Sequence, residues 1–252
     1  MKHLIARRAR LLTALDGRPA LIGAGAPIGR NYPANPYPFR ASSHFLYLVG
    51  RSMPGAWLHL DGEATVYTEA PPPDDDLWHG VTPGPEAIAA DIGCAVRYGA
   101  PPVEPGTLTL AAPDLASCAT QAGWLGRAFT PGGLAEPDAP LAEGMISLRL
   151  CHDAAAIAEL RSAAEATTAG HLAGMAATRP GVSEWAICAA MEAAIKRLGM
   201  GTAYQSIVSV EGEVLHNHHY DNVAEAGDLL LADVGAETAG GWAGDVTRTW
   251  PV

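Results

Sequence analysis

Residues 228–235 read DLLLADVG, and residues 241–249 read GWAGDVTRT. The apolar run before Asp233 predicts a strand buried on both faces, yet the run ends in this carboxylate. A second carboxylate, Asp245, follows twelve residues later. A hairpin that turns through residues 238–240, with Gly240 in the left-handed last position, would pair residue 233 with residue 245. The pattern therefore predicts two aspartates on one face, with Cβ atoms roughly 4.5–5.5 Å apart.

Two like charges placed in this way repel each other, and burial strengthens the repulsion. A shared proton, a nearby arginine or a cation would offset it, and carboxylate oxygens suit divalent metals such as Mn²⁺ and Mg²⁺. Paired carboxylates that bridge two ions are a common basis for hydrolysis. The register is an assumption, because a two-residue loop would send the aspartates to opposite faces. The alternative is a solvated Asp233 at a strand end and an Asp245 that is bonded to Arg248.

A histidine cluster precedes this segment, in residues 215–220, which read LHNHHY. If this stretch is extended, His216 and His218 share a face. Such a cluster serves as a metal site, a proton relay or simply a polar loop, and the residues alone leave all three open.

Two helices are expected before the hairpin. Asp153 is typical of an N-cap, and the pattern to Ala177 predicts a long amphipathic helix. Ser183 predicts the cap of a second helix that ends at Gly199. The expected inner face of the first helix consists of Ile157, Leu160, Ala164, Leu172 and Met175.

The first half of the chain has shorter elements, punctuated by proline and glycine. The strands expected there are residues 20–24, 45–49 and 108–111, with a hairpin of 56–60 and 64–67 around Asp61-Gly62; the helices are residues 7–15, 85–92 and 116–125. The change to long helices near Gly144 predicts two domains, residues 1–143 and 144–252.

The composition excludes several classes of protein. Among the 252 residues, 27 are acidic against 16 lysines and arginines, which gives a net charge of −11. Nucleic acids and anionic membranes both attract basic surfaces, so neither is an expected partner. No apolar run approaches the roughly 18 residues of a membrane span, and no signal-peptide core follows the N-terminus. The four cysteines (Cys94, Cys118, Cys151 and Cys188) are widely spaced. This spacing predicts reduced thiols in a cytoplasmic protein.

Several motifs together resemble the aminopeptidase P and prolidase family of metallopeptidases. Residues 233–237 with 243–249 are similar to its first metal-ligand segment, and residues 206–216 to the strand and histidine before it. Residues 149–161 resemble the opening of its catalytic domain, although His152 stands where a lysine is usual. Residues 37–50 and 76–80 look like the signature of the aminopeptidase P N-terminal domain.

The resemblance implies a fold, an activity and a set of roles. The fold is an α/β N-terminal domain, of the kind shared by creatinase and aminopeptidase P, followed by a truncated α+β pita-bread domain. The activity is removal of the N-terminal residue before proline. Asp233 and Asp245 would be metal ligands, with Asp245 bridging two divalent ions, manganese first and cobalt or zinc as alternatives. His216 would be catalytic, touching the substrate or stabilising the tetrahedral intermediate. The partner would be a peptide with proline in second position, and the full-length form would be a homo-oligomer.

One departure from the family concerns the ligands. The family uses a further histidine and two glutamates from the second half of the catalytic domain, whereas this sequence stops at Val252. We therefore expect a fragment, or else a degenerate member, that is inactive on its own and binds metal weakly. The remaining alternatives are a prolidase, a creatinase-like hydrolase, which works without the metals, and a non-catalytic binding module of the same fold. A downstream reading frame that supplies the missing ligands would favour the enzyme.

Overall fold

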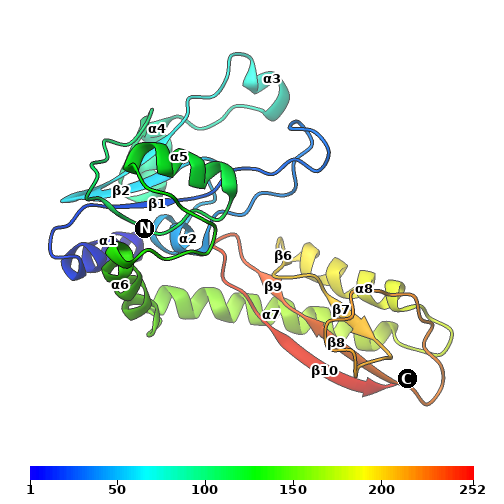
Figure 1. The fold of residues 1–252 in the computed structure, drawn as a ribbon. Helices are drawn as coiled ribbons and strands as arrows, with labels where there is room; N and C mark the ends of the chain where they lie inside the picture. The colour runs from blue at the N-terminus through cyan, green and yellow to red at the C-terminus, as the bar shows by residue number, and fades with distance from the viewer. The chain divides into compact units, whose positions relative to one another are not determined.

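Two units make up the computed structural model, which describes residues 1–252: unit 1 is Met1–His152 and unit 2 is Asp153–Val252 (Figure 1). The division falls later than the boundary expected at residue 143, which lies inside helix α6 (Ala139–Arg149). Helix α6 buries Leu141, Met145 and Leu148 and contacts the first helix of the chain. Since its apolar side completes the core of unit 1, the helix belongs with the N-terminal elements.

Unit 1 is built on a five-stranded mixed sheet. Its elements in chain order are α1 (Lys2–Ala14), β1 (Ala20–Gly23), α2 (Ser43–Val49), β2 (Trp57–Asp61), β3 (Glu63–Thr68), α3 (Asp75–His79), α4 (Pro85–Ile92), β4 (Ala95–Tyr98), β5 (Leu108–Thr109), α5 (Leu115–Leu125), η1 (Glu136–Asp138) and α6. The strand order is β4-β3-β2-β1-β5, with β1–β5 and β3–β4 parallel and the other pairs antiparallel. Helix α5 covers one face of this sheet, and α1 and α2 lie on the other (Figure 1). The hairpin expected around Gly62 is confirmed as β2–β3.

The apolar run at residues 45–49 forms helix α2, so the strand expected there is wrong. Ser42 caps the helix by accepting a hydrogen bond from Phe45 N at 3.3 Å, and Gly50 ends it with a left-handed φ of 73°. Every residue from Phe45 to Val49 is buried. A segment buried on all sides has no polar face, so its periodicity does not distinguish a helix from a strand.

A buried arginine ties three helices of unit 1 together. Arg8 of α1 is 3% exposed, and its guanidinium donates to Leu48 O at 2.7 Å, Ile92 O at 2.9 Å and Gly93 O at 2.8 Å. These carbonyls lie at the C-terminal ends of α2 and α4, where helix carbonyls lack partners and the helix dipole favours a cation.

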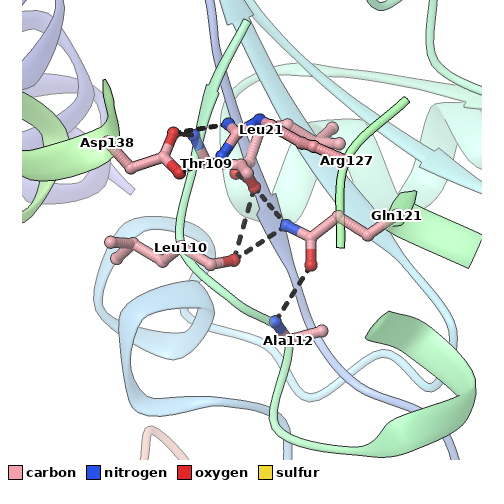
Figure 2. A network of polar contacts seen from close by, with 7 residues as sticks. All are labelled: Leu21, Thr109, Leu110, Ala112, Gln121, Arg127 and Asp138. Carbon is pink, nitrogen blue, oxygen red and sulfur yellow. Dashed lines mark hydrogen bonds and ion pairs between the residues drawn. The ribbon is translucent and has the colours of Figure 1, made fainter. Parts of the chain in front are cut away.

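A polar network lies beneath α5, at the β1–β5 edge (Figure 2). Gln121 is fully buried, and its side chain joins Thr109 Oγ1, Leu110 O and Ala112 N. Asp138 accepts from Thr109 N at 2.8 Å and pairs with Arg127 through both guanidinium nitrogens. Buried polar groups of this kind are stable only when they are bonded, so the network fixes where α5 sits on the sheet.

Unit 2 consists of two helices and two small sheets. Its elements are α7 (Ala154–Ala177), α8 (Glu184–Arg197), β6 (Gly201–Thr202), β7 (Ile207–Ser209), β8 (Leu229–Val234), β9 (Ala236–Glu237) and β10 (Val246–Pro251). Strands β10-β8-β7 form an antiparallel sheet, and β6 pairs with β9. The caps expected for the helices are confirmed: Asp153 accepts from Ala156 N at 2.8 Å, and Ser183 from Ala186 N at 3.3 Å. None of the helices in either unit combines the length and apolar character that a membrane crossing requires.

The face that α7 buries is the opposite of the expected one. Leu172 is 61% exposed, and Ile157 and Met175 are each 40% exposed. The buried side carries small residues instead, among them Gly170 and Gly174. A Cβ at Gly174 would lie 2.7 Å from the Met191 side chain of α8, so the two helices pack too closely for larger residues. The buried face of α7 is therefore set by its close packing against α8 through small residues, not by its large apolar side chains.

The segment between β8 and β10 packs against α7 as closely as α8 does at Gly174. A Cβ at Gly235 would lie 1.9 Å from Gly244 O, and a Cβ at Gly244 would lie 2.5 Å from Thr167 Oγ1. The Thr167 hydroxyl also accepts from Ala236 N at 2.9 Å. These contacts hold the hairpin against the helix in a single position.

We predict that Gly235→Ala destabilises unit 2 by about 3 kcal/mol, because the added methyl group must displace a backbone carbonyl. Gly201→Ala is the matched control, since nothing lies within 4 Å of a Cβ at Gly201. Urea unfolding followed by circular dichroism measures both variants. Equal stability of the two variants would contradict the close approach of the hairpin strands.

Candidate metal centre

The β8–β10 hairpin has a different register from the one expected. Thr238 N donates to Trp242 O at 2.9 Å, so the three-residue loop is 239–241, with Gly241 at a φ of 78° in the left-handed last position. The loop lies one residue later than expected, and the pairing is shifted by two residues. Asp233 therefore faces Thr247. Because a shift of two residues preserves the face, Asp245 is a diagonal neighbour of Asp233 on the same side of the sheet.

The two carboxylates meet at one phenol. The Tyr204 hydroxyl lies 2.5 Å from Asp233 Oδ1 and 3.0 Å from Asp245 Oδ1. Asp233 is half-buried and Asp245 is exposed. Arg248 forms no hydrogen bond or ion pair with either aspartate, and its guanidinium donates to Thr247 O at 2.7 Å. The predicted convergence of the two aspartates on one site is confirmed, whereas the direct cross-strand pairing is wrong.

Tyr204 is the residue of this site that the sequence analysis missed. The segment before it belongs to β6, which pairs with β9, and Ala203 N donates to Gly235 O at 2.9 Å. These bonds bring the phenol beside the end of β8. No spacing or motif in the sequence indicates this contact, because it depends on the pairing of two very short strands.

The environment of Tyr204 raises the pKa of its phenol above the ordinary value. Burial is the largest cause, followed by the hydrogen bond to Asp233 and the charges of both carboxylates. All of these favour the protonated phenol, which is the form that donates. One hydroxyl carries one proton, so it satisfies one carboxylate at a time and leaves the other without this donor.

The histidine segment forms one wall of the same pocket. The pocket has a volume of about 370 Å³, and its lining residues are Tyr204, Gln205, Ile207, His216, His218, Asp233 and Asp245. Asn217 is buried between the two histidines, donates to Ser209 Oγ at 3.2 Å and accepts from His219 N at 2.9 Å. This anchoring leaves His216 and His218 exposed at the pocket, as expected for two residues on one face, and His219 outside its lining.

The chemistry of the donor set agrees in part with a divalent metal site. Two carboxylates that converge on one point are ligands that hard cations prefer. The structure contains no group of three or more histidine, cysteine, aspartate or glutamate side chains arranged to hold a metal ion. The two aspartates could therefore supply part of the coordination shell of a metal ion, but not all of it.

Comparisons with known proteins agree with this geometry. The family described as "Metallopeptidase family M24" matches residues 158–252, and "Aminopeptidase P, N-terminal domain" matches residues 4–99. The chain belongs to the aminopeptidase P and prolidase family. Its fold is therefore an aminopeptidase P N-terminal domain followed by part of a pita-bread domain.

Three relatives of this family illustrate the similarity. The Xaa-Pro aminopeptidase of Haemophilus influenzae is 28% identical over 98% of this chain and 60% of its own length. The Xaa-Pro dipeptidase of Edwardsiella ictaluri is 28% identical over 99% of this chain and 57% of its own length. The solved structure of proline aminopeptidase P II from Yersinia pestis matches with a TM-score of 0.76 and 26% identity, covering 99% of this chain and 62% of that one. The chain thus spans about three fifths of the length of these relatives.

We predict that Tyr204→Phe destabilises unit 2 by about 1–2 kcal/mol at neutral pH, because a charged carboxylate loses its donor. The raised pKa gives the sign of the pH dependence. The stabilisation by the phenol is fully present below its unfolded pKa of about 10 and is lost as the pH rises through the higher folded value.

Urea unfolding from pH 6 to pH 11 measures this difference. The difference in the free energy of unfolding between wild type and Tyr204→Phe is expected to be constant up to about pH 9 and to decrease above about pH 10. Tyr98→Phe, at an exposed tyrosine, is the control. A difference in unfolding free energy that increases at alkaline pH would contradict the assignment of the phenol as donor.

Proposed function

We propose that this chain belongs to a metal-dependent Xaa-Pro aminopeptidase, in which Asp233 and Asp245 are metal ligands. The observation that carries the proposal is the convergence of both carboxylates on the Tyr204 hydroxyl, in a pocket that His216 also lines. This pocket lies within the region matched by the M24 metallopeptidases. The substrate is a peptide with proline in its second position, as the names of the relatives suggest.

Two divalent ions, proposed to be manganese, would be held in part by Asp233 and Asp245. A divalent ion in such a site polarises the scissile carbonyl and so supplies the Lewis acid for hydrolysis. The chain's own residues do the rest. The carboxylates supply the negative charge that retains a cation, and Tyr204 holds Asp233 in place while donating to it.

His216 is proposed to act directly on the substrate. Its side chain is exposed at the pocket wall, and Asn217 anchors the loop that carries it. A histidine beside the scissile bond donates a hydrogen bond to the oxygen that becomes negatively charged in the tetrahedral intermediate. His218 lines the same pocket and is available to contact the peptide, although its role is secondary in this proposal.

The aminopeptidase is favoured over the dipeptidase by the N-terminal unit. The match to the aminopeptidase P N-terminal domain covers residues 4–99, whereas the relatives include enzymes named for both activities. A homo-oligomer of the complete enzyme is part of the same proposal. A tripeptide with proline in second position, compared with an Xaa-Pro dipeptide, distinguishes the two activities.

We predict that the 252-residue chain binds Mn²⁺ more weakly than the micromolar range, because two carboxylates leave most coordination positions of two ions unfilled. Asp245→Asn is expected to weaken binding at least tenfold, which is about 1.4 kcal/mol. Glu213→Gln, at an exposed glutamate of the same unit, is the control. Isothermal titration calorimetry measures both, and micromolar affinity of the wild-type chain would contradict the prediction.

We predict no turnover of an Xaa-Pro tripeptide by the 252-residue chain, and turnover when a histidine and two glutamates are supplied by a longer reading frame or a complementing fragment. In that complete enzyme Asp245→Ala is expected to abolish turnover while unit 1 stays folded, since the change removes a ligand rather than packing.

Chromatographic detection of the released N-terminal residue measures the activity, and a tripeptide with alanine in second position is the control substrate. An inactive complete enzyme with intact metal binding would favour the alternative, a non-catalytic binding module. Equal cleavage of the alanine peptide would contradict proline specificity.

A further inference from the structure

Unit 1 contains a pocket of its own, of about 540 Å³. It lies at the edge of the sheet where β1, β3 and β4 end and helix α5 begins, and all of its lining residues belong to unit 1. In α/β folds, ligands commonly bind outside the carboxyl ends of the strands. The volume is in the range of small-molecule sites.

The loops around this pocket are fixed by hydrogen bonds. Asp114 accepts from Ser117 N at 2.8 Å, which caps α5, and from Ala26 N at 2.8 Å, which ties the loop after β1 to the helix. Gly55 N donates to Gly25 O at 2.8 Å, and Gly99 N donates to Thr68 O at 3.0 Å. The pocket is therefore formed without a ligand, which lowers the entropic cost of binding.

Three aromatic side chains line the pocket. The ring of Trp57 meets that of Trp124 edge to face, with centroids 5.1 Å apart and an interplanar angle of 71°. Tyr67 faces Trp57 across the β2–β3 pair. A Cβ at Gly23 would lie 2.8 Å from Trp57 Cζ3, so the absence of a side chain there is what allows the indole to lie over β1.

Ser117 and the solvent-exposed Glu69 are polar residues of the lining whose side chains bond no other protein group. Ser117 is 6% exposed as a residue, and its hydroxyl, which bonds no protein group, is accessible from the pocket. Glu69 is the one charged residue of the lining, and its carboxylate has neither a hydrogen bond nor an ion pair. The Ser117 hydroxyl is therefore free to bond a water molecule or a ligand atom in the pocket.

The geometry points to a binding site for an organic cation, namely an ammonium group that carries alkyl substituents and a hydroxyl or similar polar group. Aromatic faces attract such cations, most strongly those of tryptophan. Glu69 supplies the opposite charge, and no lysine, arginine or histidine lines the pocket to repel the ligand. The Ser117 hydroxyl meets the polar group of the ligand. This site is independent of the proposed peptidase function.

Choline and its neutral isostere 3,3-dimethyl-1-butanol test the proposal on the full chain, since they differ in charge but share shape and hydroxyl group. Isothermal titration calorimetry is expected to show saturable choline binding that is about tenfold tighter than binding of the isostere. Absence of saturable choline binding, or equal affinity for the two compounds, would overturn the proposal.

Two variants locate the site. Glu69→Gln is expected to weaken choline binding about threefold to tenfold while leaving the isostere unaffected, and Trp124→Leu to weaken it about tenfold. The matched controls are Glu63→Gln, at the far end of the strand that precedes Glu69, and Trp78→Ala, at an 83% exposed tryptophan. Circular dichroism establishes that each variant is folded. Choline binding that both Glu69→Gln and Trp124→Leu leave unchanged would place the cation elsewhere and overturn the assignment.

Discussion

The contact between two glycines and helix α7 is the constraint on which the candidate metal centre depends. Gly235 and Gly244 have no side chains, so β8 and the strand returning toward β10 approach each other and the helix more closely than any other residue would allow. Thr167 completes the contact by accepting from Ala236 N. Because these contacts prevent the two hairpin strands from shifting along each other, they select one pairing register from several that the loop could form.

That register decides the chemistry of the site. A shift of one residue would separate Asp233 and Asp245 on opposite faces, whereas the observed shift of two keeps them together as diagonal neighbours. Diagonal placement leaves room between them for the Tyr204 hydroxyl, which lies within hydrogen-bond distance of both carboxylates and donates to one of them at a time. The repulsion between like charges is thus reduced by a donor, and a cation shared between the same oxygens would reduce it further.

Unit 1 uses its two sheet faces differently. On the α1 and α2 side, apolar packing is completed by the Arg8 guanidinium, which satisfies helix carbonyls in the core. On the α5 side, a polar network around Gln121 and a pair of tryptophans replace a uniformly apolar core (Figure 2). Such a mixed face positions α5 accurately, and the N-terminal end of this helix borders the pocket of unit 1. That end is where a ligand site is proposed.

The sequence by itself determined the elements whose signals are local. The caps at Asp153 and Ser183, the strand of β8 and the hairpin at Gly62 follow from neighbouring residues, and the two aspartates and His216 could be singled out by spacing and family resemblance. Only the tertiary structure decided the rest. The strand expected at residues 45–49 is a helix because burial on all sides removes periodicity. The buried face of α7 is set by the approach of α8 at Gly174. The hairpin register and the position of Tyr204 depend on contacts between residues distant in sequence, and no local pattern encodes a distance across a packed interface.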